Sequence, residues 1–213
     1  MKINIIRGRE QIGGSIIELS TNTTKIILDI GIELNEEDKT AVPCIEGLFC
    51  GNKEVDAVLI SHYHSDHVGL FPYLLPEIPV YMGDVAYKML KAFYDYTDIP
   101  INFTPQSIFE DRAFSIGDIN ITPIKCDHSA CDSYMFLLEH DGKTVLYTGD
   151  FRSNGRQDYQ ALLKKLPEVD ALIIEGTVLS RTEGQKNISE EKLEEIAAAY
   201  AEKHRGPVFF MMS

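Results

Sequence analysis

The chain has 213 residues, which fits one domain, or one domain and the beginning of another. Its 20 basic and 33 acidic side chains give a formal net charge of −13, which works against broad electrostatic capture of nucleic acid. No apolar run is long enough to span a bilayer or to form a signal peptide, so we expect a cytoplasmic protein without a membrane contact. The four cysteines have no C-x-x-C spacing, which argues against a structural zinc knuckle.

The beginning of the chain is patterned as an antiparallel meander. Its three short apolar and β-branched runs cover residues 3–6, 15–19 and 25–29. The third run ends in Asp29, a carboxylate that either caps a turn or supports a neighbouring functional loop. The sequence favours neither role. Residues 35–52 are poorly patterned and indicate a loop with a short helix.

The densest chemical signal follows a buried apolar strand at 57–60. The motif His62-Tyr63-His64-Ser65-Asp66-His67 contains three of the six histidines in the chain. His62 and His64 are two residues apart, so in an extended chain their side chains project from the same side. Asp66 and His67 follow where the chain is expected to turn into a helix over 68–75. Imidazole and carboxylate ligands together suit zinc, with manganese or iron as alternatives.

Alternating strands and helices are predicted after this motif. A helix over 84–96 should begin at the N-cap Asp84, and its stripe of Val85, Met89 and Phe93 should face the core. A shorter helix is expected over 159–166. Strands are expected at 79–81, 114–116, 120–125, 134–139, 144–147 and 171–175, the last of them buried.

The final segment predicts one more helix and the start of a strand. Ser189 is the expected N-cap, and Leu193, Ile196, Ala197 and Tyr200 recur at helical spacing. The apolar run 208–212 reads as the beginning of a buried strand, so we expect a truncated chain. His204 lies at the end of this helix and His140 at a hairpin tip, and neither is expected to bind metal.

Two further strand ends carry candidate ligands. The segment Cys126-Asp127-His128 places a histidine in a polar turn, whereas Cys126 is expected to pack rather than to bind metal. The segment Thr148-Gly149-Asp150 ends in a carboxylate that can bridge two cations. Two divalent ions about 3.5–4 Å apart can share a hydroxide and stabilise the attacking and leaving oxygens. This chemistry suits hydrolysis of a phosphodiester, ester, thioester or lactam, and redox chemistry stays open if the metal is iron.

In order and context, His62-x-His64-x-Asp66-His67, His128 and Asp150 resemble the motifs of the metallo-β-lactamase superfamily. The resemblance runs from the N-terminal meander to about Thr177. It implies an α+β fold, an αββα four-layer sandwich lacking its C-terminal part, with the site at one edge of the paired sheets. It also implies two Zn²⁺ ions. One would be held by His62, His64 and His128, the second by Asp66 and His67, and Asp150 would bridge them.

Residues 148–152 and 173–177 resemble the ribonuclease J and β-CASP nuclease branch of that superfamily. This implies hydrolysis of RNA or DNA phosphodiesters by a dinuclear metal-bound hydroxide, with Asp66 and Glu175 as catalytic residues. Residues 1–186 would form the metallo-β-lactamase-like domain. Residues 187–213 would lead into a β-CASP-like domain, missing from this chain, that grips RNA or single-stranded DNA.

One ligand of the superfamily has no counterpart in this chain. The superfamily normally supplies a further histidine to the second metal, and neither His140 nor His204 has a fitting context. We therefore expect weak binding of the second ion and poor or no turnover by this chain alone. A hydrolase of small esters or thioesters, favoured by the charge of −13, and a metal-binding module without catalysis stay open. The nearest basic group is expected to be a solvated face: Arg152, Arg156, Lys164 and Lys165.

Overall fold

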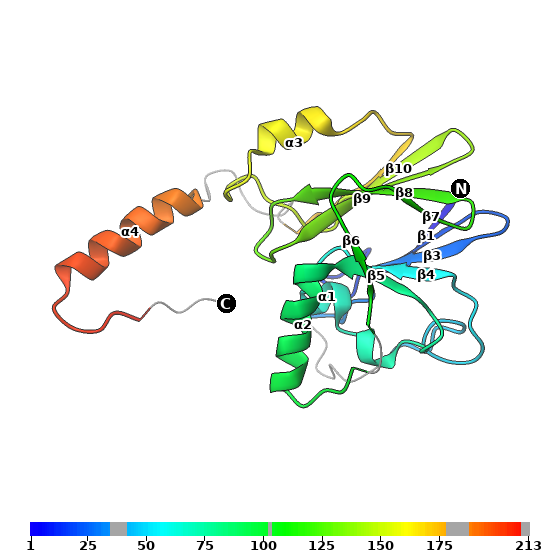
Figure 1. Cartoon of the computed structure of the whole chain (residues 1–213), viewed down its shortest axis with the longest axis horizontal. Coiled ribbons are helices and arrows are strands. Elements are labelled where there is room, and N and C mark those ends of the chain that lie inside the picture. Colours follow the sequence, from blue (N-terminus) through cyan, green and yellow to red (C-terminus); the bar gives the residue numbers. More distant parts are fainter. Residues whose placement is uncertain (35–41, 102–103, 178–187, 210–213) are drawn as a thin grey trace.

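The structure is a computed structural model that describes residues 1–34, 42–101, 104–177 and 188–209. Its framework is two β-sheets that lie face to face (Figure 1). In the first sheet the strands lie side by side in the order β1 (Lys2–Arg7), β2 (Ile16–Ser20), β3 (Lys25–Leu28), β4 (Ala57–Leu59), β5 (Val80–Gly83) and β6 (Gln106–Ile108). The second has the order β11 (Ala171–Ile173), β10 (Lys143–Tyr147), β9 (Ser133–His140), β8 (Ile119–Cys126) and β7 (Phe114–Ile116). The helices are α1 (Ser65–Val68), the 3-10 turn η1 (Phe71–Tyr73), α2 (Asp84–Tyr96), α3 (Tyr159–Lys165) and α4 (Glu190–Lys203).

The strand directions bring several strand ends to one edge of the molecule. β1, β2 and β3 pair antiparallel in chain order, which confirms the predicted meander. β3 to β6 then pair parallel, as do β10 and β11. Parallel strands end at the same edge of a sheet, and ligand sites form outside those ends. The histidine motif follows β4 at that edge.

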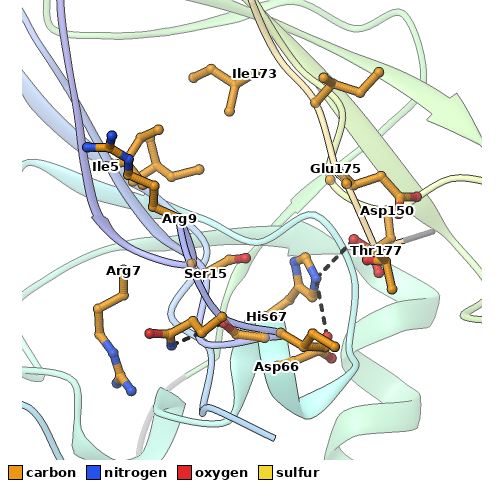
Figure 2. Close-up of a pocket in the computed structure, with 18 of the residues that line it drawn as sticks. Ile5, Arg7, Arg9, Ser15, Asp66, His67, Asp150, Ile173, Glu175 and Thr177 are labelled. Atoms are coloured by element: carbon orange, nitrogen blue, oxygen red, sulfur yellow. Dashed lines mark hydrogen bonds and ion pairs between the residues drawn. The ribbon is translucent and has the colours of Figure 1, made fainter. Parts of the chain in front are cut away.

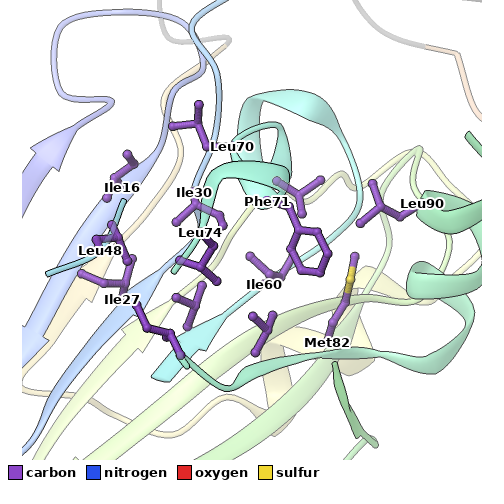
Figure 3. Packing of buried hydrophobic residues seen from close by; sticks show 14 of the residues in the cluster. Ile16, Ile27, Ile30, Leu48, Ile60, Leu70, Phe71, Leu74, Met82 and Leu90 are labelled. Atoms are coloured by element: carbon purple, nitrogen blue, oxygen red, sulfur yellow. The ribbon is translucent and has the colours of Figure 1, made fainter. Parts of the chain in front are cut away.

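The apolar residues form layers because side chains alternate along each strand. Ile26 and Leu28 of β3 pack between the sheets with Phe136 of β9. Ile27 faces the opposite side, where it packs with Leu90 of α2 and with the residues drawn in Figure 3. A smaller cluster on the outer face of the second sheet packs against α3. Helices therefore cover both outer faces of two stacked sheets, and the predicted αββα sandwich is confirmed.

Helix α2 covers residues 84–96 as predicted, but its predicted core stripe is wrong. Val85, Met89 and Phe93 are 47%, 47% and 56% exposed. The residues that face the core lie one position further along and have the same fourfold spacing: Ala86, Leu90 and Tyr94. Both stripes fit an amphipathic helix, and packing against the sheet selects between them. Asp84 is the first helical residue, so the predicted N-cap is also wrong by one position, and Gly83 precedes the helix.

The helix expected over 68–75 is wrong as well. α1 ends at Val68, and only the short turn η1 follows it. Pro72 lies within η1, and a proline disfavours helical backbone at the residue before it, which breaks the predicted helix. β11 is shorter than the predicted strand, and its outer face is open: Leu172 is 52% exposed.

The last helix forms as predicted, and the Ser189 hydroxyl accepts a hydrogen bond from the backbone N–H of Lys192. None of its described residues is buried, and Figure 1 shows α4 extending away from the sheets. Val208 and Phe209 are not in a strand, and Phe209 is 87% exposed. The rest of the predicted strand lies outside the described residues. Residues 35–41 of the loop predicted earlier in the chain lie outside them as well. Within the described ranges, no helix has the length and apolar character to cross a membrane.

Candidate metal centre

Three loops that follow β4, β8 and β10 meet at one edge and place their polar side chains together. Side chains of His62, His64 and His128 form one group whose nitrogens all lie within 4.8 Å of one another. His62, His67 and Asp150 form a second group by the same measure. The convergence predicted from the strand ends is therefore present, although 64 residues separate His64 from His128.

The imidazoles of the first group turn their nitrogens towards one another. Nδ1 of His64 lies 3.1 Å from Nε2 of His128. His62 is fully buried, and its Nε2 has no hydrogen-bond partner among the described residues. A buried polar atom without a partner is costly and needs an explanation. A cation bound between these rings would supply it, so the donor set fits a metal ion that prefers imidazole nitrogen.

Asp150 belongs to the second group and also faces the first. Its Oδ1 is 3.2 Å from Nε2 of His67, and its Oδ2 is 3.7 Å from Nε2 of His128. Each carboxylate oxygen thus faces a different histidine, as a bridging ligand requires. Asp66 is more distant, with 3.7 Å between its Oδ2 and Nε2 of His67, and it belongs to neither tight group.

Asp29 supports the site from behind, which decides between the two roles left open by the sequence. This fully buried carboxylate accepts hydrogen bonds from the backbone N–H and the hydroxyl of Ser61, at 2.7 and 2.8 Å. Its Oδ2 lies 2.7 Å from Nδ1 of His67 and accepts a hydrogen bond from the hydroxyl of Tyr147. Asp29 adopts a positive φ of 57° at the end of β3, which turns its side chain to these partners. Ser61 in turn places its Oγ 3.0 Å from Nδ1 of His62.

The protonation states suit metal binding. Burial lowers the pKa of His62 well below its ordinary value, lowers that of His64, and lowers that of His128 to about 4. These three rings are therefore neutral near neutral pH and have a nitrogen lone pair available. Burial also opposes the charged form of His67, but Asp29 and Asp150 beside its ring raise its pKa well above the ordinary value. Metal binding at His67 would have to displace this proton.

A cleft of about 530 Å³ opens beside the second group (Figure 2). Asp66, His67, Asp150 and Glu175 line it. Glu175 is half-buried and accepts a hydrogen bond of 3.0 Å from the backbone N–H of Phe151. Burial first, and then the nearby Asp150, raise the pKa of its carboxyl group. The predicted site residues therefore all lie at this edge of the sheets.

Other candidates lie away from the site or are occupied elsewhere. Nδ1 of His140 is 2.9 Å from the carbonyl oxygen of Asp118, and Nδ1 of His204 is 2.8 Å from that of Tyr200. Cys126 is buried in the cluster under α3, as predicted, and burial raises the pKa of its thiol to about 12.

The predicted basic group is largely used in ion pairs within the chain. Arg152 contacts Asp127 and Glu190, and Arg156 contacts Glu190 and Glu194. These pairs agree with a solvated face rather than a phosphate track. Asp127 also accepts hydrogen bonds from the backbone N–H groups of Arg156 and Gln157, which holds the loop after β10 beside His128.

Sequence reasoning missed two supporting residues, Ser61 and Tyr147. Ser61 directly precedes the histidine motif, and Tyr147 ends the strand that leads to Asp150, so their positions were a usable signal. The sequence left open whether their shared partner Asp29 caps a turn or supports the site, because its partners come from other parts of the chain.

Comparison with known proteins agrees with this geometry. A family model described as a β-lactamase superfamily domain matches residues 24–209. Ribonuclease J of Helicobacter pylori is 27% identical over 159 residues, which cover 71% of this chain and 23% of that protein. An RNase J-like protein of Methanocaldococcus jannaschii is 28% identical over 205 residues, which cover 89% of this chain and 46% of that protein. The chain thus spans less than half the length of these curated relatives.

A solved structure of a protein of unknown function from Enterococcus faecalis has a TM-score of 0.81 to this chain at 24% sequence identity. The match covers 94% of this chain and 57% of that one, and it shows the fold alone. Three findings lead to one conclusion: the two sheets with outer helices, the cluster of histidines and an aspartate at the strand ends, and the family match over most of the chain. The chain belongs to the metallo-β-lactamase superfamily, as its motifs predicted.

Proposed function

We propose that this chain is the metal-binding part of a zinc-dependent nuclease that hydrolyses phosphodiester bonds of RNA. The observation that carries the proposal is the pair of ligand groups around Asp150, beside a cleft that a substrate can enter. Relatives named ribonuclease J and RNase J-like protein support RNA as the substrate. Single-stranded DNA has the same reacting group and is a second substrate to test.

The proposed ligand assignment keeps the first group whole, and for the second cation it adds Asp66, which lies outside both groups, to His67 and Asp150 of the second group. His62, His64 and His128 would hold the first cation. Asp66 and His67 would hold the second, with Asp150 between them. Divalent cations at these positions would activate a water molecule and stabilise negative charge on the attacking and leaving oxygens. Zinc suits the imidazole-rich set, and manganese or iron are the alternatives to load.

The residues of the chain have separate tasks in this proposal. Asp29 holds the ring of His67 so that Nε2 points to Asp150. Asp66 would orient the attacking water at the floor of the cleft. Glu175, whose pKa is raised by burial, would exchange a proton with the reacting groups. Asp66 and Glu175 are therefore the proposed catalytic residues.

The proposal includes a further domain, because the curated relatives are more than twice as long as the part that this chain matches. We expect residues 1–186 to form the catalytic domain and the segment 187–213 to lead to a β-CASP-like domain that holds the nucleic acid. The second cation would have an incomplete ligand set among the residues of this chain. We therefore expect slow turnover by the 213-residue chain alone.

The test compares two substrates under controlled metal content. The protein is stripped with EDTA, reloaded with zinc or manganese, and incubated with end-labelled single-stranded RNA or with a small thioester. We expect slow, metal-dependent cleavage of RNA that is lost in His128→Ala and kept in His204→Ala. Hydrolysis of the thioester but not of RNA would instead favour a small-ester hydrolase. Metal binding without either reaction would leave a binding module.

A further inference from the structure

The wall of the cleft opposite Glu175 is built by the loop between β1 and β2, residues 8–14, which we call the cleft loop. It is fixed to the histidine motif by its backbone. The N–H of Ser15 donates to the carbonyl oxygen of Asp66 at 3.2 Å. Gly13, at φ 79°, comes so close that a Cβ on it would lie 2.7 Å from Cβ of Asp66. The end of the cleft loop therefore keeps a set position relative to the candidate metal ligands.

Two arginines line this side of the cleft, and they differ in how they are held. The side chain of Arg7 is 16% exposed and lies 3.5 Å from Glu33. The side chain of Arg9 is 77% exposed, and its ion pair with the equally accessible Glu10 measures 3.9 Å. An exposed pair of this length is worth little. The guanidinium of Arg9 is thus available to an anionic ligand at little cost.

The positive charge of Arg9 lies across the cleft from two of the acidic residues that line it. Figure 2 shows Arg9 next to Ile5 on one side of the cleft, Glu175 and Asp150 on the other, and His67 and Asp66 between them. The floor is acidic, and bound divalent cations would reverse its charge. A ligand that spans the cleft would then meet cations at the floor and at the rim. Ile5 and Ile173 also line the cleft and provide apolar contact surface.

We propose that Arg9 binds a phosphate of the substrate strand that flanks the phosphodiester at the metal centre. The cleft loop would be the wall that holds a single-stranded ribonucleotide segment, with phosphate on Arg9 and bases against the isoleucines. The planar guanidinium matches a phosphate in a two-point contact, which an ammonium group cannot reproduce. The inference rests on the proposed nuclease function. It adds a residue that binds a neighbouring phosphate of the RNA strand rather than the phosphodiester that is cleaved.

The test measures binding and hydrolysis separately. Zinc-loaded protein is titrated into a fluorescein-labelled single-stranded RNA at several salt concentrations, and anisotropy gives the affinity. Arg9→Ala should weaken binding about tenfold and lower the salt slope by about 0.7, the share of one phosphate contact on a single strand. Arg9→Lys keeps the charge and should recover part of the affinity. Arg112→Ala is the matched control, because it removes the same charge from an arginine that lies over the ring of Phe109, outside the cleft lining.

Hydrolysis of bis(p-nitrophenyl) phosphate, a small diester without flanking phosphates, is followed in the same preparations. Arg9→Ala should lower RNA affinity by a larger factor than this rate, Arg112→Ala should change neither, and thermal melting checks that both variants are folded. Equal RNA affinities and salt slopes for Arg9→Ala and Arg112→Ala would overturn the inference, as would a wild-type protein that does not bind RNA at low salt. Arg9-dependent RNA binding without hydrolysis of either substrate would instead count against the proposed function and leave the binding site standing.

Discussion

Oδ2 of Asp29 lies 2.7 Å from Nδ1 of His67, and the two side chains are 0% and 6% exposed. A histidine whose Nδ1–H donates to a carboxylate keeps Nε2 as the atom that faces the ligand side, and its ring cannot rotate freely. In this chain Nε2 of His67 faces Asp150. The geometry of the second ligand group therefore depends on a residue that belongs to neither group.

Replacement of Asp29 tests this dependence. Asn keeps the size of the side chain and tolerates a positive φ, but it removes the charge that faces His67. We expect Asp29→Asn to weaken zinc binding by about 10–100-fold. Competition with a chromogenic chelator measures the affinity. Asp56→Asn, which alters a carboxylate that accepts from the backbone N–H of Lys25, is the control and should bind as the wild type does.

Tyr147 should contribute to stability through the same carboxylate. Its hydroxyl is buried and donates to Asp29, and burial raises the pKa of Tyr147 well above its ordinary value, so the proton stays in place. Tyr147→Phe leaves Asp29 short of one donor and should lower the free energy of unfolding by about 1–2 kcal/mol in urea denaturation. Tyr200→Phe, at an exposed position on α4, should change it by less than about 0.5 kcal/mol. Equal effects of the two substitutions would contradict a stabilising hydrogen bond from Tyr147 to Asp29.

The two ligand groups should differ in how firmly they hold metal. The first has three neutral imidazoles, whereas the second must displace a proton from His67. After zinc loading and gel filtration, elemental analysis should find one ion retained per chain, and a second only with excess zinc in the buffer. His128→Ala should lose the retained ion, and His204→Ala should keep it. Two ions held through gel filtration would show that the ligand set of this chain is sufficient.

The packing of α2 can be tested with neighbouring residues. Leu90 is 3% exposed and Met89 is 47% exposed. Leu90→Ala removes buried methyl groups and leaves a cavity, and should cost about 2–5 kcal/mol. Met89→Ala should cost less than about 0.5 kcal/mol, because little contact is lost. Chemical denaturation of both variants gives the comparison, and a larger loss for Met89→Ala would mean that the helix is rotated from the position described.

Asp118 should make stability depend on pH in the acid range. Hydrogen bonds from threonine hydroxyls, Thr24 first and then Thr21 and Thr23, lower its pKa from 3.8 to about 2. A carboxylate with a lowered folded-state pKa stabilises the fold above its unfolded-state pKa, and this contribution is lost as the pH falls towards 2. The melting temperatures of wild type and Asp118→Asn should therefore differ above about pH 4 and converge below it. Glu77→Gln, which removes a carboxylate at an exposed position, is the charge-matched control.

Most elements were predictable because their signals are local. The hairpin of β9 and β10 follows from the turn Asp141-Gly142, whose residues both adopt positive φ. The start of α4 follows from Ser189, which needs only the next turn of helix as its partner. The buried face of α2 was not predictable, because two stripes with equal spacing differ only in their contact with a distant sheet.

The sequence by itself determined the set of donor side chains and their local geometry: three histidines and an aspartate within six residues at a strand end, and single ligands after two later strands. Only the tertiary structure decided which carboxylate would orient His67. Asp29 lies 38 residues before His67 and 118 residues before Tyr147, and the three meet only when the end of β3, helix α1 and the end of β10 are packed together. Hydrogen bonds across such separations depend on sheet pairing and packing, which are cooperative properties of the whole chain rather than of any segment.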